Sequence, residues 1–181
     1  MTFYKFLNPK GRCVYTNGVW HLPENGKPGR WMPKTGPVEE CKCGYHIVNK
    51  SHLIHWLAPE LYEVETRGGV TIYGDKCAVR QARVIKRVES WNEKTAALFA
   101  ADCAEAVLHI FESKFPNDYR VRECIDATRG FVHGDVTQAD LHFARAAAWD
   151  AARAAARAAA WDAERDFQTV LLWQYLGIDN N

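Results

Sequence analysis

The chain has 181 residues, of which 48% are hydrophobic and 12% aromatic, so its composition excludes wholesale disorder. No apolar run approaches the roughly 18 residues of a membrane-spanning helix, and the N-terminal residues lack the charged and then apolar layout of a signal peptide. The six cysteines are therefore expected to be reduced thiols of a cytoplasmic protein with no membrane partner.

The first forty residues contain many turn-forming residues, and short aromatic runs between them predict strands at 2–7, 13–15 and 19–22. Residues 23–40 are expected to form a long surface loop. Further strands are predicted at 42–48, 61–67, 70–73 and 77–88, with Gly68-Gly69 as a turn and a short helix at 51–57. These elements predict a small twisted sheet with one short helix.

At Trp91-Asn92 the hydrophobic period changes from two residues to 3.6, which indicates helices. They are predicted at 92–113, 118–134 and 137–176, with Thr137 and Asp140 resembling a capping box at the start of the third. This third segment is rich in alanine, which has the best helix propensity, and it stays open whether it is one helix or two. Acidic residues of the first helix and arginines on or before the second are expected to form ion pairs.

The sequence therefore predicts an α+β protein of two domains, a basic β-rich domain at 1–91 and an acidic, alanine-rich three-helix domain at 92–181. Residues 1–92 carry 14 Lys and Arg against 8 Asp and Glu, a net charge of +6, and residues 93–181 carry 9 against 14, a net charge of −5. Two explanations stay open: the domains attract each other, or the basic domain meets an anionic partner.

Cysteines and histidines cluster between residues 41 and 55. Thiolate and imidazole suit zinc, and the ligands of a zinc site would be Cys41, Cys43, His46 and His52. However, structural zinc sites usually take cysteine pairs with two to four residues between them, a single residue separates Cys41 from Cys43, and no second cysteine pair follows at standard spacing. We therefore expect no metal and no cofactor.

The order of elements in the N-terminal part resembles the first half of an ADP-ribosyltransferase-like fold: strand 2–7, a strand with Gly44-Tyr45-His46, a short helix and the strand from Leu61 to Thr66. That resemblance implies a pocket for the nicotinamide of NAD. His46 would face this pocket, and Glu63 or Glu65 would supply a carboxylate. An enzyme of this kind is the second hypothesis for the function.

A basic run beside Trp91 suggests a third hypothesis, an accessory protein that binds nucleic acid. Its members are Arg80, Arg83, Lys86 and Arg87. Cations next to an aromatic ring suit phosphates and single strands, although no RNA-binding or helix-turn-helix signature accompanies them. A charged sheet edge is the simpler explanation.

The third helical segment is longer than its two partners and carries large apolar side chains. Those expected at an interface are Trp149, Trp161, Phe167, Leu171, Leu172 and Trp173. Residues 167, 171 and 172 recur at helical spacing and predict an apolar strip that joins two copies in a homodimer. The alternative is that the basic domain covers this strip.

The stretches 101–112, 116–122 and 125–129, together with Gly134, resemble the helical immunity-protein domain of bacterial and phage sequences, and the resemblance covers about residues 92–176. Residues 40–46 and 73–76 resemble a small phage-associated domain of unknown function. The resemblance implies a phage or mobile-element protein in the bacterial host cytoplasm, an immunity- or anti-defence-type inhibitor. Such a protein would bind and occlude a bacterial protein target, so an interaction protein is the first hypothesis.

Overall fold

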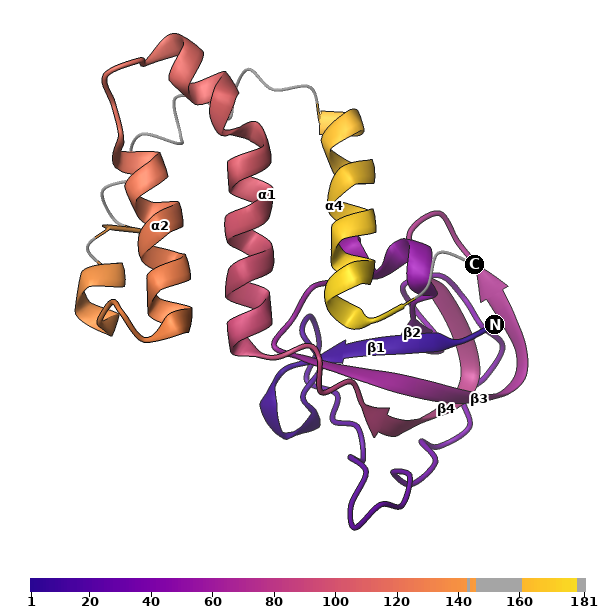
Figure 1. The fold of residues 1–181 in the computed structure, drawn as a ribbon. Coiled ribbons are helices and arrows are strands. Elements are labelled where there is room, and N and C mark those ends of the chain that lie inside the picture. The colour runs from indigo at the N-terminus through magenta and orange to yellow at the C-terminus, as the bar shows by residue number, and fades with distance from the viewer. Residues whose placement is uncertain (143, 146–160, 179–181) are drawn as a thin grey trace. The chain divides into compact units, whose positions relative to one another are not determined.

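The computed structural model describes residues 1–142, 144–145 and 161–178, with the backbone alone for 161–166. The chain divides into two compact units, Met1–Asn92 with Leu176–Asn181, and Glu93–Tyr175. A sheet comes first and helices follow, which confirms the predicted α+β class (Figure 1).

The first unit is built on a four-stranded antiparallel sheet in the order β1-β3-β4-β2. The strands are β1 (Phe3–Leu7), β2 (Tyr45–Ile47), β3 (Glu60–Ile72) and β4 (Cys77–Arg87), and two 3-10 helices are η1 (Pro9–Gly11) and η2 (Lys50–His55). The short helix expected at 51–57 is η2. Asn49 caps it, because its side-chain oxygen accepts a hydrogen bond from the backbone N–H of His52.

The sheet curls until its two edge strands meet. Tyr4 of β1 and Val48, directly after β2, exchange backbone hydrogen bonds of 2.7 and 2.9 Å. Two irregularities in the pairing of β3 with β4 add local twist that favours this curling. The inward face carries a core of nine buried residues, Leu7, Trp20, Ile47, Tyr62, Val64, Cys77, Val79, Ala82 and Val84.

The predicted turn at Gly68-Gly69 is wrong, because β3 continues through it to Ile72. Arg67 pairs with Gln81 and Val70 with Val79, so the two glycines oppose one residue of β4. This is a β-bulge, and Gly68 has a φ of +90°, which glycine adopts without a steric penalty. The hairpin turn lies at residues 73–76 instead, where the Tyr73 N–H donates to the Lys76 carbonyl at 2.8 Å.

The strands predicted at 13–15 and 19–22 are also wrong. Residues 13–15 form no strand, and Val19 makes an isolated bridge with Arg12. Each stretch lies in a loop between turn-forming residues. Trp20 still belongs to the core of the sheet, and Cys13 and Leu22 pack against that core. Their aromatic and apolar composition therefore reflects burial and not strand pairing.

Part of the loop predicted at 23–40 is bonded to the sheet. The backbone N–H groups of residues 29, 32 and 35 donate to carbonyls of β4, at residues 84, 82 and 80, over 2.9–3.0 Å. We call residues 29–35 the strap. The Trp31 ring lies near the guanidinium carbons of Arg67 and Arg83, 3.9 and 4.6 Å from its centroid. The strap therefore covers an edge of β4 that would otherwise expose backbone groups.

The second unit contains α1 (Glu93–Lys114), α2 (Arg120–His133) and α4 (Trp161–Leu176), the last of which ends in the first unit's part of the chain. The helices predicted at 92–113 and 118–134 are confirmed within two residues. Thr137 donates to the Asp140 carboxylate at 2.6 Å and accepts from its N–H at 3.2 Å, so the predicted cap is confirmed. The question of one helix or two falls on residues 146–160, which lie outside the described residues.

Candidate functional site

A pocket of about 590 Å³ lies in the first unit, at the seam where β1 and β2 meet. Beside the two strands, its walls come from the loop at 13–20 and from residues near 41–44, 55–56 and 75–76. Four of the aromatic side chains that line it form two edge-to-face pairs: Trp20 with Tyr45, and Tyr15 with Trp56, at centroid distances of 5.4 and 5.5 Å. The pocket is therefore largely apolar, with a few polar groups.

Lys5 is the polar group on the inward face of β1. Strand alternation places it on the same face as Phe3 and Leu7, which pack in the core. Its Nζ donates to the His46 carbonyl oxygen at 2.8 Å and lies 5.7 Å from the centroid of the Trp20 ring. Burial lowers the pKa of this amine from its usual 10.5, an effect that the nearby Cys13 thiol opposes. Lys5 is thus a lysine in a mainly apolar setting.

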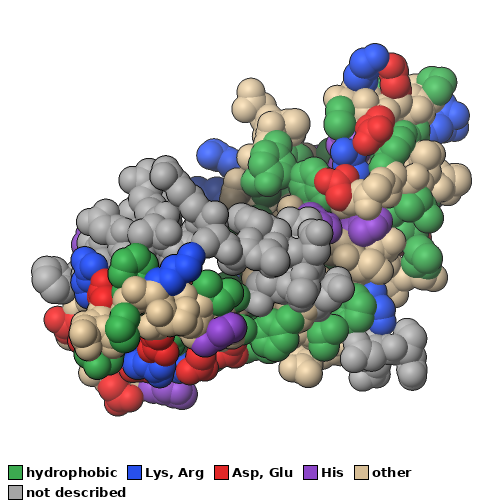
Figure 2. Space-filling view, turned by 90° about the horizontal axis from the view of Figure 1, so that it is seen from above, with side chains coloured by type: hydrophobic (Ala, Val, Ile, Leu, Met, Phe, Trp, Pro, Cys, Tyr) green, Lys and Arg blue, Asp and Glu red, His purple; other side chains and the backbone are tan. Residues whose placement is uncertain are grey.

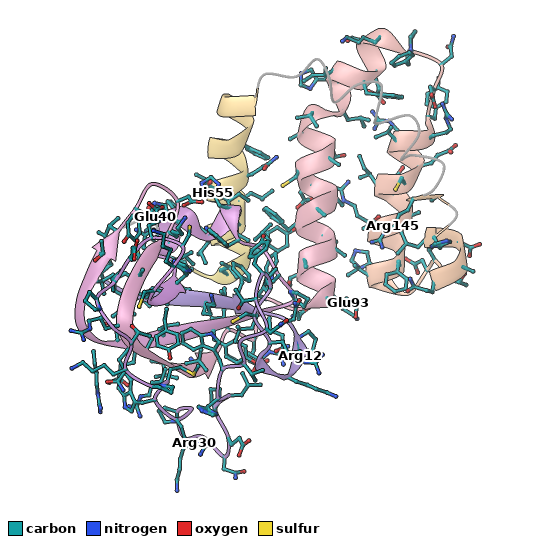
Figure 3. All side chains as sticks on the ribbon, turned by 180° about the vertical axis from the view of Figure 1, so that it is seen from behind. Arg12, Arg30, Glu40, His55, Glu93 and Arg145 are labelled. Atoms are coloured by element: carbon teal, nitrogen blue, oxygen red, sulfur yellow. The ribbon has the colours of Figure 1, made fainter. Side chains whose placement is uncertain are left out.

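His46 of β2 also lines the pocket. Its Nε2 atom is buried and has no hydrogen-bond partner within the described residues. Burial lowers the pKa of the imidazole, and the positive charges of Lys5 and Lys76 lower it further. Lys76 forms ion pairs with Glu40 and Asp75 at 3.2 and 3.5 Å. Figure 3 shows Glu40 and His55, another lining residue, at one end of this unit.

The two carboxylates of the ADP-ribosyltransferase hypothesis do not line this pocket, although His46 does. Glu65 instead forms an ion pair with Arg83 at 2.6 Å. Glu63 lies in β3 opposite Tyr4 of β1, and its charge contributes to raising the pKa of Tyr4. The structure therefore brings together the histidine and a pocket, without a carboxylate from β3.

The four residues of the alternative zinc site are divided. Cys41 and His46 line the pocket, whereas Cys43 and His52 do not. In the part of the chain that the structure describes, no three His, Cys, Asp or Glu side chains lie where they could hold one metal ion.

The basic run of β4 is divided in the same way. Arg83 pairs with Glu65, and Arg87 pairs with Glu60 and Glu89 at 3.5 and 3.8 Å, so carboxylates balance these two charges. The side chain of Arg80 donates to the carbonyl of Thr35 in the strap. Lys86 is exposed. The four cations therefore serve partly to hold the sheet and the strap.

The predicted apolar strip of the third helical segment needs one correction. Leu172 is fully buried, at 0% exposure, so it is a core residue and not part of an accessible surface. Phe167 is 46% exposed, and Leu171 and Trp173 are half-buried. Trp149 and the side chain of Trp161 lie outside the described residues.

An exposed aromatic surface on the second unit was not anticipated from the sequence. Phe115 and Tyr119, in the connection between α1 and α2, are 39% and 56% exposed. The Phe115 ring packs on buried Phe111 at a centroid distance of 5.1 Å. We call residues 115–119 the aromatic corner. In the sequence, the aromatic corner can be recognised as two aromatic residues that flank Pro-Asn-Asp. The predicted ends of the two helices do not indicate that these aromatic side chains are exposed.

Charged groups fasten α1 to α2 as predicted. One nitrogen of Arg129 lies 2.6 Å from carboxylate oxygens of both Asp102 and Glu105, and Arg122 pairs with Glu112 at 2.6 Å. The remaining expected arginine, at position 120, pairs with its neighbour at 118 instead. Figure 2 shows acidic and basic side chains side by side on the helices.

Ion-paired helices, a small apolar seam of residues 101, 108 and 125, and exposed aromatic side chains characterise the second unit as a helical domain. Residues 86–165 match the family described as Imm-5 like putative immunity protein. The match confirms the expected immunity-protein-type domain and covers less than half of the chain. No curated protein and no solved structure matches the chain. Within the described residues, no helix is long and apolar enough to cross a membrane.

Proposed function

We propose that this protein is an immunity- or anti-defence-type inhibitor, carried by a phage or mobile element, that binds a protein target in the bacterial cytoplasm. It acts by occluding the surface with which the target works. The observation that carries the proposal is the match of residues 86–165 to an immunity-protein family. Inhibition of this kind needs a contact surface and no catalytic group.

The aromatic corner supplies the anchor of that surface. Aromatic side chains dominate the binding energy of many protein interfaces, because they bury a large area with little loss of conformational freedom. The Phe115 ring packs on the Phe111 ring, and Tyr119 is the N-cap residue of α2. The corner therefore presents to a partner the Phe115 ring, which Phe111 holds in place, and the exposed Tyr119 ring.

Charge gives this surface its preference among partners. Glu123 and Asp126 follow the corner on α2, both are exposed, and neither forms an ion pair within the described residues. The part of the chain from residue 93 on has a net charge of −5. A basic target surface, such as one that binds nucleic acid, is complementary to it, and opposite charges speed association at low salt.

The test is co-expression in bacteria of the full chain with each toxic protein encoded beside its gene, scored by survival and followed by calorimetry on the purified pair. We expect protection against one of them and a one-to-one complex. Tyr119→Ala should lower the affinity at least tenfold. The control is Val19→Ala, which changes a 52% exposed apolar residue of the first unit and should leave the affinity unchanged.

Two results would contradict this proposal. Absence of both protection and binding against all neighbouring proteins would refute the inhibitor function. A complex that forms equally well with Tyr119→Ala would place the contact outside the aromatic corner. Phe167→Ala, measured in the same series, then asks whether α4 makes the contact instead.

The ADP-ribosyltransferase hypothesis retains one supporting observation, His46 at the wall of an aromatic pocket. Calorimetry with NAD tests it. Binding of NAD that His46→Ala abolishes would support an enzyme, and absence of heat at millimolar NAD would exclude this substrate.

A further inference from the structure

We propose that the pocket at the seam of β1 and β2 binds a small organic anion with a flat aromatic body, whose charged group contacts the Lys5 amine. The inference concerns the first unit and is independent of the inhibitor function. Carboxylate, sulfonate and phosphate groups share the chemistry that this site would recognise.

Lys5 occupies a strand position on the inward face of the sheet. An inward-facing strand position between Phe3 and Leu7 normally carries an apolar side chain, because a charged amine loses hydration there. An ammonium group has three donors, and in the described part of the chain one of them is used, on the His46 carbonyl. No carboxylate of the described residues forms an ion pair with Lys5. An anion in the pocket would supply the missing charge and acceptors.

Lys5 differs from the other lysines of the pocket in its charge partners. Lys42 and Lys76 also line it, but each has a carboxylate partner of its own, Glu39 at 2.5 Å and Glu40 at 3.2 Å. Their charges are therefore largely neutralised within the protein. Lys5 is the lining cation of the described residues whose charge is left for a ligand.

The volume and the wall polarity of the pocket suit a small aromatic molecule. A volume of about 590 Å³ falls within the range of about 300–1,000 Å³ typical of sites for small molecules. Trp20 lies beside the Lys5 amine and edge-to-face with Tyr45, so an aromatic ring next to the anion would find apolar partners. The buried Nε2 of His46 offers a second polar contact that fixes orientation.

Fluorescence titration with 8-anilinonaphthalene-1-sulfonate, an aromatic anion, tests the proposal on the full chain. Lys5→Met keeps the length of the side chain and removes its charge, and we expect it to raise the Kd at least tenfold. The matched control is Lys86→Met, which removes an exposed lysine of β4 and should leave the Kd unchanged. The neutral probe N-phenyl-1-naphthylamine should bind the parent chain and both variants alike.

Competition identifies the anionic group, because benzoate and adenosine monophosphate displace the probe according to whether carboxylate or phosphate is preferred. Equal Kd values for the parent and Lys5→Met would overturn the proposal, and so would equal losses in both lysine variants.

Amide chemical shifts of the parent chain provide a measurement that needs no variant. On addition of the probe, the largest chemical-shift changes should occur at Lys5, Trp20, Tyr45 and His46. Shifts confined to residues outside the pocket would overturn the proposal even if Lys5→Met failed to fold. A folded Lys5→Met variant whose Tm equals or exceeds that of the parent would show that the lysine is retained for binding and not for stability.

Discussion

Replacement of Arg129 by methionine removes the group that fastens α2 to α1. Its guanidinium contacts Asp102 and Glu105, one turn apart on α1, each at 2.6 Å. Asp102 also accepts a hydrogen bond from the Tyr175 hydroxyl of α4 at 2.5 Å. The substitution keeps most of the apolar stem and leaves two neighbouring carboxylates without their shared cation.

The expected loss follows from burial and geometry. The side chains of Arg129 and Asp102 are 30% and 29% exposed, and that of Glu105 is 49% exposed. An exposed pair contributes about 0.2–1 kcal/mol, and a partly buried carboxylate left unpaired costs more. We expect Arg129→Met to lower the free energy of unfolding by about 2 kcal/mol. The control is the single pair of Arg122 with Glu112, whose side chains are 48% and 32% exposed; because only one carboxylate loses its partner, Arg122→Met should lower the free energy of unfolding by about 0.5 kcal/mol.

The loss should also depend on pH in a defined direction. The hydrogen bond and charge of Arg129 lower the pKa of Glu105 from its usual 4.5. A lowered carboxylate pKa contributes stability that is fully present above about pH 4.5 and is lost as the pH falls through the lowered value. The difference between the parent and Arg129→Met should therefore be constant near neutral pH and shrink in acid.

Urea unfolding followed by far-ultraviolet circular dichroism at pH 7 and at pH 3 measures both effects. Equal destabilisation by the Arg129 and Arg122 variants would refute the reasoning, because it would mean that the second carboxylate and the partial burial contribute nothing. A difference that stays the same at the two pH values would show that Glu105 does not take part.

A Cβ atom at Gly29 of the strap would lie 1.8 Å from the His21 carbonyl oxygen. Gly29→Ala should therefore destabilise the first unit by about 2–4 kcal/mol, measured by thermal unfolding. The control is Gly74→Ala, which should change the stability little because no atom lies within 4 Å of the added Cβ. Tyr62 and Tyr175 both have a pKa raised to about 12, mainly by burial, so absorbance during an alkaline titration should show at least two tyrosines that ionise late. The stability they contribute is fully present below pH 10 and lost as the pH rises through 12, and complete ionisation near pH 10 would contradict this. If the chain forms a homodimer, light scattering should give twice the monomer mass of 20.6 kDa, and Phe167→Glu should reduce the measured mass to that of the monomer. A parent chain with the monomer mass would exclude the dimer.

Local sequence patterns were sufficient for the first two helices of the second unit and for the cap at the start of the third predicted segment. The change of period after Trp91 predicts α1, and the side chains of Thr137 and Asp140 bond as the spacing of a cap requires. Helices depend on contacts within four residues, so the residues that decide them lie inside the pattern itself. The same stretches carry the resemblance to immunity proteins that the family match confirms.

Tertiary pairing decided the features that matter most in the first unit. Gly68-Gly69 suits a turn by composition, and it is a bulge because residues of β4 pair on both sides of it. The composition of the strap predicts a loop, but its backbone is hydrogen-bonded to β4, a strand about fifty residues later in the chain. Such pairings depend on segments far apart in sequence, which no local pattern specifies.

The residues of the candidate sites also differ in whether the sequence or the fold distinguishes them. The sequence by itself singled out His46 as a residue of interest, because its type and neighbours suggested chemistry, but it gave Lys5 no distinction among fourteen basic residues of residues 1–92. Lys5 stands out when the curled sheet brings β1 to β2 and turns that side chain toward Trp20 and the His46 carbonyl. In the same way, helical spacing placed Leu172 on a strip, and packing decided that it is buried. Residue type and spacing are properties of the chain, whereas burial and the loss of hydration depend on what the fold places around each group.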